Sequence, residues 1–291
     1  MMRCKLLNLL IIVVGVATSC TNVTDIEIAL DEPKYVLNCL LAPDSSWHVT
    51  LTKSLNIQQA QYYFDPVTDA TVEIYDHNDL LIESLAPSKT DWHLGQYDGN
   101  LKPVQGERYM VKAQVAGGLT LLARTYVPQN VPISSYKIDS TLFKSNGEPV
   151  QMTISIQDPP EQTNYYLIKV LRDYYYVHNA DTIRQREDVY YELVDPSFQE
   201  NFNLPVNDNL FNGKMHDLEI KISGFGYSAV TENVQLLLLT ISEEYYLYLT
   251  TKDLQERIEG DPFAQPAPIF SNVENGIGIF AAYSTSSIRL K

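Results

Sequence analysis

The stretch Thr71-Val72-Glu73-Ile74-Tyr75 carries the alternation that decides the fold. Val72 and Ile74 point to one side of an extended chain and the residues between them to the other, which is the period of a half-buried β-strand. Gly117-Gly118 farther along predicts a two-residue hairpin turn. Similar β-prone runs separated by turn residues surround this stretch: Tyr35–Leu41, Trp47–Thr52, Leu80–Leu85, Arg108–Ala116 and Leu119–Val127. About six or seven strands in about 95 residues are typical of an immunoglobulin-like or transthyretin-like sandwich.

The segment Val127-Pro128-Gln129-Asn130-Val131-Pro132 interrupts this rhythm, because neither proline can donate to a β-ladder. We expect a domain boundary there, between an N-terminal β-sandwich at residues 33–128 and a C-terminal β-rich domain at residues 133–291. In the second half we expect strands at Gln151–Gln157, Tyr165–Val177, Val189–Leu193, Leu218–Ser223 and Val234–Thr240, then two or three closing strands around Asn275-Gly276. The predicted fold class is mainly β, with two β-sandwich-like domains.

One substantial helix is predicted in the C-terminal domain, near residues 242–259. Ser242 is a good N-cap, and two glutamates follow in the first turn, where the helix dipole favours anions. Gly260 stands at the C′ position, and the proline that follows at Pro262 forbids continuation. Four residues fall on one face at helical spacing and are expected to pack: Leu247, Thr251, Leu254 and Ile258.

Residues 1–19 have the features of a signal peptide, with Arg3 and Lys5 followed by an apolar run that is too short to span a bilayer. The small residues before Cys20 resemble the lipobox of bacterial lipoproteins, in which that cysteine is acylated, for example with palmitate, and becomes the new N-terminus. The alternative is a secretory peptide that ends in cysteine by chance. Residues 20–32 would then be a lipidated tether, and Cys39 would be a small buried apolar side chain in the folded body.

The formal net charge of −15 over 291 residues argues against nucleic-acid binding and against a basic membrane-binding surface. Cleavage would remove two positive charges and no negative ones, so the acyl chains on Cys20 are expected to hold the protein at the outer membrane.

No motif of established chemistry is convincing. The five histidines are too widely spaced to predict a metal site. Two G-x-G-x-x-A sequences, at Gly224–Ala229 and Gly276–Ala281, run into strand-like sequence and not into the helix that a pyrophosphate site requires. Carboxylate pairs lie in turn-like, polar sequence, where solvated loops are expected: Asp65/Asp69, Asp76/Asp79 and Asp181/Glu187. We therefore predict no catalytic residues, no cofactor and no metal. An enzyme of undetected type is the alternative.

Paired and tripled tyrosines are the remaining unusual feature. In a strand, neighbouring side chains point to opposite faces, so one ring of each pair can lie in the core while the other reaches the surface. Tyr174 and Tyr176 share one face of a predicted strand and form the candidate recognition surface, because exposed tyrosine is enriched at interfaces. The alternative is that these rings only cover the core.

The chain resembles a family of Bacteroidetes outer-membrane lipoproteins known only as domain-of-unknown-function family 4249. The segments that carry the resemblance run along the mature chain: Lys34–Asn38, Leu41–Asp44, Leu51–Ser54, Asp69–Tyr75, Leu210–Lys214, Ile241–Leu249, Asp261–Phe263 with Pro266, and Ser271–Phe280. The resemblance implies a non-enzymatic ligand-binding or docking accessory of a TonB-dependent transporter, in either leaflet of the outer membrane. It does not identify the ligand, and the family has no established catalytic residues to transfer to this chain. A fimbrial subunit is the alternative, but no arginine for proteolytic maturation lies between Arg3 and Arg108.

Overall fold

The computed structural model describes residues 32–55, 65–138, 149–160, 162–179, 181–194, 205–223, 229–259 and 263–290. The predicted signal peptide, Cys20 with nearly all of the tether, and the C′ residue Gly260 lie outside these ranges. The chain divides into two compact units, Met1–Glu32 and Pro33–Lys291, and the second is described below. None of its described helices combines the length and the apolar character needed to cross a bilayer.

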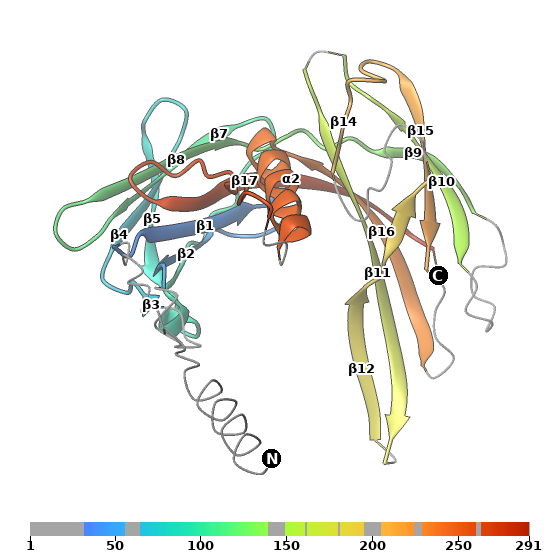
Figure 1. The fold of residues 1–291 in the computed structure, drawn as a ribbon, viewed down its shortest axis with the longest axis horizontal. Helices are drawn as coiled ribbons and strands as arrows, with labels where there is room; N and C mark the ends of the chain where they lie inside the picture. The colour runs from blue at the N-terminus through green and yellow to red at the C-terminus, as the bar shows by residue number, and fades with distance from the viewer. Residues whose placement is uncertain are drawn as a thin grey trace, which may run out of the picture. The chain divides into compact units, whose positions relative to one another are not determined.

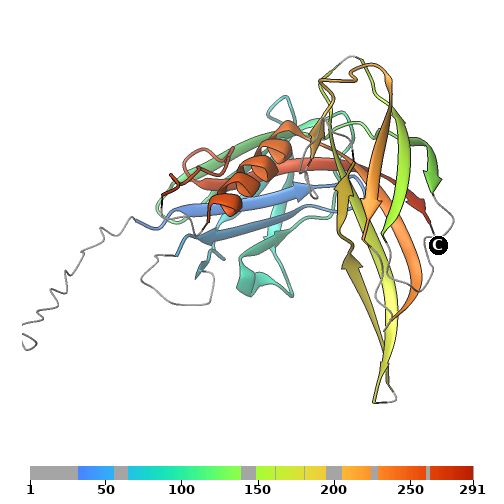
Figure 2. The ribbon, with the colours of Figure 1, turned by 45° about the vertical axis from the view of Figure 1, so that its right-hand side comes forward.

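The second unit is mainly β, as predicted, with one large mixed sheet, one small sheet and the helix α2 (Figures 1 and 2). The N-terminal part of the sequence supplies β1 (Tyr35–Leu41), β2 (His48–Lys53), β3 (Asp65–Pro66), β4 (Thr71–Tyr75), β5 (Leu81–Pro87), β6 (Gln96–Asp98), β7 (Arg108–Gln114) and β8 (Thr120–Tyr126), with a 3-10 turn at Trp92–Leu94. Val72 and Ile74 of β4 are buried, so the alternation predicted from sequence is confirmed. Gly117 and Gly118 both have positive φ in the β7–β8 turn. The predicted two-residue loop is wrong, because Gln114 pairs with Thr120 and the Val115 N–H donates to the Leu119 carbonyl, which leaves three residues in the loop.

The remainder supplies β9 (Ile133–Ile138), β10 (Val150–Gln157), β11 (Tyr165–His178), β12 (Asp181–Asp188), β13 (Tyr191–Leu193), β14 (Val206–Asn207), β15 (Met215–Ile222), β16 (Val230–Ile241), α2 (Glu243–Ile258) and β17 (Ile277–Arg289). The large sheet has the strand order β12-β11-β16-β17-β1-β2-β6-β5-β4-β7-β8, with β14 beside β11 and β3 beside β2. The small sheet has the order β13-β15-β10-β9. Strands β9 and β12 lie where no strand was predicted.

Two large hydrophobic cores hold the unit together. The first is built mainly from β1 to β8 around Trp47 and Tyr97, and the second lies between the small sheet and strands β11 and β16 around Tyr166 and Tyr191. Phe280 of β17 is fully buried in the first core, while Ile288 of the same strand packs against the second. Strand β17 thus contributes to both cores. The division into two domains at Pro128–Pro132 stays a prediction.

Strand β17 corrects the predicted two or three closing strands, because the segment after Gly276 forms one strand of thirteen residues. Its first half pairs in parallel with β1, and its second half pairs antiparallel with β16. The parallel pairing requires close backbone approach at Gly278, which has a φ of +121° and lies opposite Leu37. A Cβ added to Gly278 would lie 2.1 Å from the Leu37 carbonyl oxygen, so only glycine fits there without a backbone shift.

Helix α2 begins where the sequence predicts. The Ser242 hydroxyl accepts a hydrogen bond from the Tyr245 backbone N–H, and it also accepts one of 3.2 Å from the Ala282 N–H of β17. The predicted packing face is wrong: Leu254 is half exposed, and Tyr245 and Leu249 make the apolar contacts with the sheet. The helix lies over β17 and β1 in both views (Figures 1 and 2). It therefore covers only part of this face of the large sheet.

Candidate functional site

The candidate site lies on the three strands β12, β11 and β16, where the sequence brings charged and aromatic side chains onto both faces. Strand β11 pairs with β12 along its second half and with β16 along most of its length. Because side chains alternate along a strand, Arg172, Tyr174 and Tyr176 share one face, and Leu171, Asp173 and Tyr175 share the other.

The face toward the second core carries the predicted recognition residues. The rings of Tyr174 and Tyr176 are stacked with centroids 6.4 Å apart, and the Tyr174 hydroxyl donates to Gln185 Oε1 of β12 at 2.8 Å. Both tyrosines are half-buried, so each ring keeps part of its surface in water. The structure therefore brings the two rings together on one face. Recognition of a partner by them stays a prediction.

Arg172 lies on the same face of β11 as the two tyrosines and is buried at the edge of the second core. Its guanidinium lies 4.7 Å from the centroid of the Tyr174 ring, Nε donates to Thr231 Oγ1 at 2.8 Å, and Nη1 pairs with Glu187 Oε1 at 3.0 Å. The Arg172 side chain is only 6% exposed, so breaking its ion pair would leave a buried charge without its partner. We assign Arg172 the structural role of holding the tyrosines and β12 in place.

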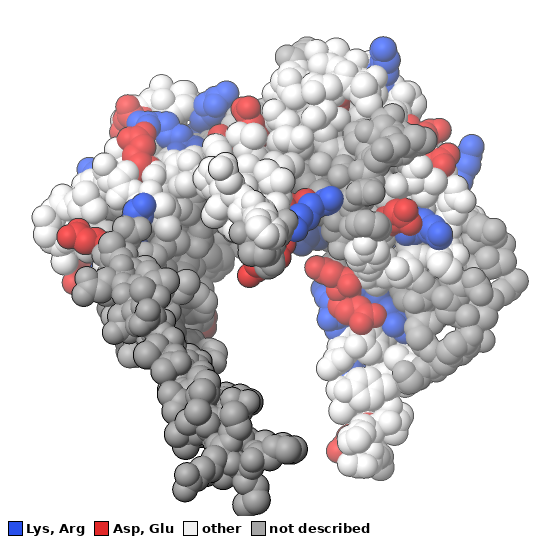
Figure 3. Space-filling view, in the orientation of Figure 1, with Lys and Arg blue, Asp and Glu red and all other residues white. Residues whose placement is uncertain are grey.

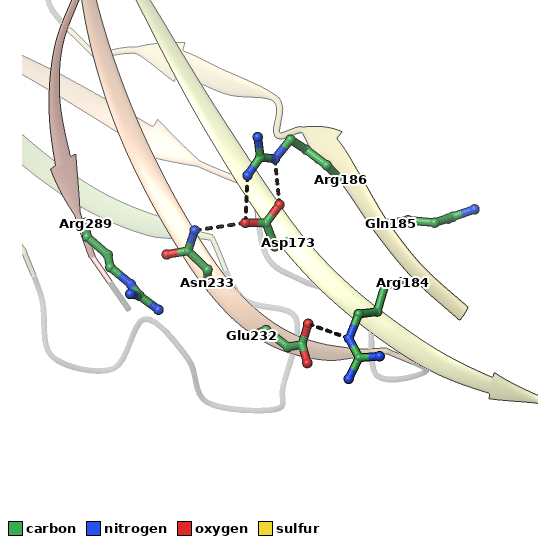
Figure 4. Close-up of a pocket in the computed structure, with 7 residues that line it drawn as sticks. All are labelled: Asp173, Arg184, Gln185, Arg186, Glu232, Asn233 and Arg289. Atoms are coloured by element: carbon green, nitrogen blue, oxygen red, sulfur yellow. Dashed lines mark hydrogen bonds and ion pairs between the residues drawn. The ribbon is translucent and has the colours of Figure 1, made fainter. Parts of the chain in front are cut away.

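The opposite face carries an open groove, here called the arginine groove, with a volume of about 610 Å³ (Figure 4). Cross-strand pairing sets Arg186 opposite Asp173 and Arg184 opposite Tyr175. The β11–β16 pairing shifts register between Asp173 and Tyr174, which marks a bulge in β16. At this bulge the neighbouring residues Glu232 and Asn233 both line the groove. The groove is lined by Asp173, Arg184, Gln185, Arg186, Glu232, Asn233 and Arg289.

Ion pairs and hydrogen bonds order the arginine groove. Arg186 holds Asp173 through two bonds, Nε to Oδ1 at 2.6 Å and Nη2 to Oδ2 at 3.0 Å, and Asn233 donates to the same carboxylate at 2.9 Å. The Arg186 and Asn233 hydrogen bonds lower the pKa of Asp173 to about 2, so this carboxylate is ionised at neutral pH. Arg184 pairs with Glu232 at 3.4 Å. Figure 4 shows these groups turned toward one another, whereas the Gln185 amide points away from them.

A second depression continues the same sheet face toward helix α2, and we call it the leucine trough. It has a volume of about 420 Å³ and crosses β11, β16 and β17 to the end of β1. Its lining combines apolar and aromatic side chains with polar ones: Leu40, Leu171, Leu237, Leu239, Tyr245 and Tyr283, with Asp44, Lys169, Asp188, Gln235, Thr285 and Ser287. Beside it, a smaller cavity of about 220 Å³ lies between Tyr245, Leu249 and strand β11.

A surface array at β2 and β6 has the group order of a hydrolase triad. Ser46 Oγ lies 3.3 Å from His48 Nε2, and His48 Nδ1 lies 2.8 Å from Asp98 Oδ1. The His48 side chain is 49% exposed, and Gln96 also donates to Asp98. These contacts follow directly from strand geometry, because His48 and Asp98 are cross-strand neighbours and Ser46 lies two residues before His48. We interpret the array as a surface hydrogen-bond ladder.

Two buried acids, Asp158 and Asp208, were not predicted from the sequence. Asp158 accepts hydrogen bonds from the Tyr166 hydroxyl and the Gly213 N–H, and Asp208 accepts one from the Asn164 N–H. Burial, together with the nearby Asp158, raises the pKa of Asp208. Asn164 Nδ2 points at Asp158 and two carbonyl oxygens, so an amide fills the centre of this oxygen cluster.

The structure also describes Cys39, Asp181 and Glu187, which were discussed from the sequence. Cys39 is buried and is not in a disulfide, and burial raises the pKa of its thiol to about 12, so it is inert as expected. Asp181 and Glu187 lie on strand β12, which corrects their assignment to a solvated loop. No cluster of three or more His, Cys, Asp or Glu within the described ranges is arranged to hold a metal ion.

The fold and the groove define a mainly β protein that presents an open, polar sheet face beside helix α2. A family model described as "Domain of unknown function (DUF4249)" matches residues 21–289. The chain belongs to this family, which confirms the resemblance stated from the sequence.

No curated protein matches the chain. One solved structure similar to it is described as "Structural basis for the promiscuous specificity of the carbohydrate-binding modules from the beta-sandwich super family". It is 8% identical, with a TM-score of 0.21, and the match covers 71% of this chain and 96% of that one.

Proposed function

We propose that this chain is a lipid-anchored, non-enzymatic outer-membrane protein that binds a ligand or docks on a partner, and that it works beside a TonB-dependent transporter. Its acyl chains would be carried by Cys20 and would hold it in the membrane. The three-stranded arm of β12, β11 and β16 would make the contact with ligand or partner.

The observation that carries the docking role is the composition of this arm. One face presents the stacked pair Tyr174 and Tyr176, and the other presents the arginine groove. Tyrosine and arginine are among the residue types enriched where proteins bind other proteins, because both offer large contact area together with hydrogen-bonding groups. Figure 3 shows basic and acidic side chains side by side over this arm.

Two further facts support the lipid anchor. The family model begins at residue 21, directly after Cys20. The chain also has a formal net charge of −15, so its bulk charge would repel anionic headgroups and could not hold it on a membrane. Acylation with two or three chains gives stable anchoring where a single chain gives only marginal binding.

The test of the anchor is the variant Cys20→Ala, with Cys39→Ala as the matched control for loss of a thiol. We expect Cys20→Ala to move from the washed membrane fraction to the soluble fraction and to lose incorporation of radiolabelled palmitate. Cys39→Ala should keep both. Retention of Cys20→Ala in carbonate-washed membranes that hold no integral binding partner would contradict lipidation.

The test of the partner is chemical cross-linking in intact cells, followed by purification in mild detergent and mass spectrometry. We expect an integral outer-membrane transporter among the cross-linked proteins. Recovery of only further copies of this chain would instead favour a fimbrial or structural subunit.

A further inference from the structure

We propose that the arginine groove and the leucine trough together form one binding site for an extended peptide of about six residues, which carries carboxylates at one end and apolar side chains at the other. This inference rests on the ligand-binding part of the proposed function and is independent of lipid anchoring.

The two depressions lie next to each other on one face of one sheet. Across β11 and β16, Asp173 lies opposite Asn233, Leu171 opposite Gln235, and Lys169 opposite Leu237. Across β16 and β17, Gln235 lies opposite Arg289 and Leu237 opposite Ser287. Successive rows of this face thus lead from the charged groove to the trough beside helix α2.

The length of this face sets the length of the ligand. From Asn233 to Leu239 strand β16 advances six residues, which is about 20 Å at the rise of a β-strand. An extended peptide has nearly the same rise, so about six residues lie along the floor from the groove to the trough.

The groove end suits carboxylates. Among the described residues, three arginines and two carboxylates line it: Arg184, Arg186 and Arg289, with Asp173 and Glu232. These arginines stand out in a chain whose overall charge is strongly negative. Each guanidinium carries about five N–H donors in a planar fork that matches a carboxylate. The Arg184 and Arg186 side chains are 68% and 60% exposed, so their ion pairs are weakened by water and an incoming anion can share the donors.

The trough end suits a peptide better than a bare hydrocarbon chain. Leu171, Leu237 and Tyr283 are half-buried and leave apolar surface open to the trough. Gln235 lies opposite Leu171 and Ser287 lies opposite Leu237, and both offer donors and acceptors for backbone N–H and C=O groups. An apolar ligand would bury these polar groups without partners, which is unfavourable.

The experiment uses the full chain with Cys20→Ala, so that anchoring does not affect the binding measurement. The probes are fluorescent hexapeptides from a small library that has two glutamates at one end and leucine, serine or threonine at the other four positions. Matched libraries replace the glutamates with glutamine. We expect some glutamate peptides to bind at least tenfold more tightly than their glutamine counterparts, with weaker binding at high salt.

The variant Arg184→Gln/Arg186→Gln should weaken this binding at least tenfold, whereas Arg124→Gln should not. Arg124 is the matched control, since it is an exposed arginine of β8 that pairs with Glu274. Leu237→Ser should weaken binding at least fivefold through the trough end. Melting curves identify folded variants, and a misfolded double variant is replaced by Arg184→Gln alone.

Three results would overturn the proposal: equal binding of the glutamate and glutamine libraries, binding that is unchanged in the folded arginine variant, or the absence of peptide binding. Tighter binding of dodecanoate or of trigalacturonate than of every peptide would also overturn it, in favour of an anionic amphiphile or an acidic glycan. A protein that binds peptide but stays in membranes as Cys20→Ala would refute the anchor and leave this site intact.

Discussion

The close approach of β1 and β17 makes Gly278 a sensitive test of the fold. The substitution Gly278→Ala adds one methyl group, which would lie 2.1 Å from the Leu37 carbonyl oxygen and 2.9 Å from its carbon. Real side chains do not tolerate such contacts with backbone, so the parallel pair would have to separate locally. Leu37 is fully buried in the first core, and its displacement would disturb the packing around it.

The matched control is Gly117→Ala in the β7–β8 hairpin turn. Gly117 also has positive φ, +88°, but nothing lies within 4 Å of an added Cβ. Gly117→Ala should therefore cost only the backbone strain, about 1 kcal/mol, whereas Gly278→Ala adds the steric overlap and should cost about 4 kcal/mol. In a folded unit of this size about 1 kcal/mol lowers Tm by about 2–4 °C.

Thermal unfolding followed by circular dichroism, on the full chain with Cys20→Ala, measures the difference. We expect Tm to fall by about 2–4 °C for Gly117→Ala and by about 8–16 °C for Gly278→Ala. If Gly278→Ala melted within about 2 °C of Gly117→Ala, the parallel pairing of β1 with β17 would be wrong.

Three other predictions follow from the structure. Ser242→Ala should lower stability by about 2–4 kcal/mol, because the hydroxyl accepts both the helix N-cap bond and a β17 backbone N–H. The pKa of buried Asp208 is raised, so the parent chain loses stability as this carboxyl ionises with rising pH. Asp208→Asn cannot ionise, and its Tm should therefore exceed that of the parent chain by an amount that grows as pH rises from 4 to 7. Replacing Tyr174 and Tyr176 with serine should lower Tm by less than Gly278→Ala does, yet reduce cross-linking to the proposed membrane partner.

Each of these has its own control. Ser271→Ala removes an exposed hydroxyl with one bond of 3.3 Å and should leave Tm within about 2 °C of the parent; an equally small effect of Ser242→Ala would place the helix start elsewhere. A Tm difference for Asp208→Asn that did not change with pH would mean that Asp208 is ionised throughout. Tyr136, 44% exposed on β9, is the control for the tyrosine pair, and an equal loss of cross-linking for Tyr136→Ser would remove the special role of the pair.

Much of the fold was predictable because alternation and capping are local signals. The strands around Val72 and Ile74, the Gly117-Gly118 turn, the Ser242 cap and the burial of Cys39 all follow from neighbouring residues. Strand β12 was missed because Asp181–Asp188 is almost wholly polar and exposed, as an edge strand with few core contacts can be.

The arginine groove was not predictable, because its residues meet only through strand register. Arg186 and Asp173 are brought together by the β11–β12 pairing, and Asn233 and Glu232 reach the groove through a bulge in β16. The burial of Asp208 likewise depends on tertiary packing. Of the candidate site, only the shared face of Tyr174 and Tyr176 could be predicted from the sequence, because residues two apart on a strand point to the same side.

The parallel pairing of β1 with β17 also governs the order in which the chain can fold as it is made. Asn38 and Ile279 are joined by a hydrogen bond across 241 residues of sequence. During synthesis the first core therefore lacks one of its strands until nearly the whole of Pro33–Arg289 has emerged, and contacts of such long range form slowly. An incomplete nascent chain is therefore expected to stay loosely packed for longer, which would suit the export that the proposed function requires.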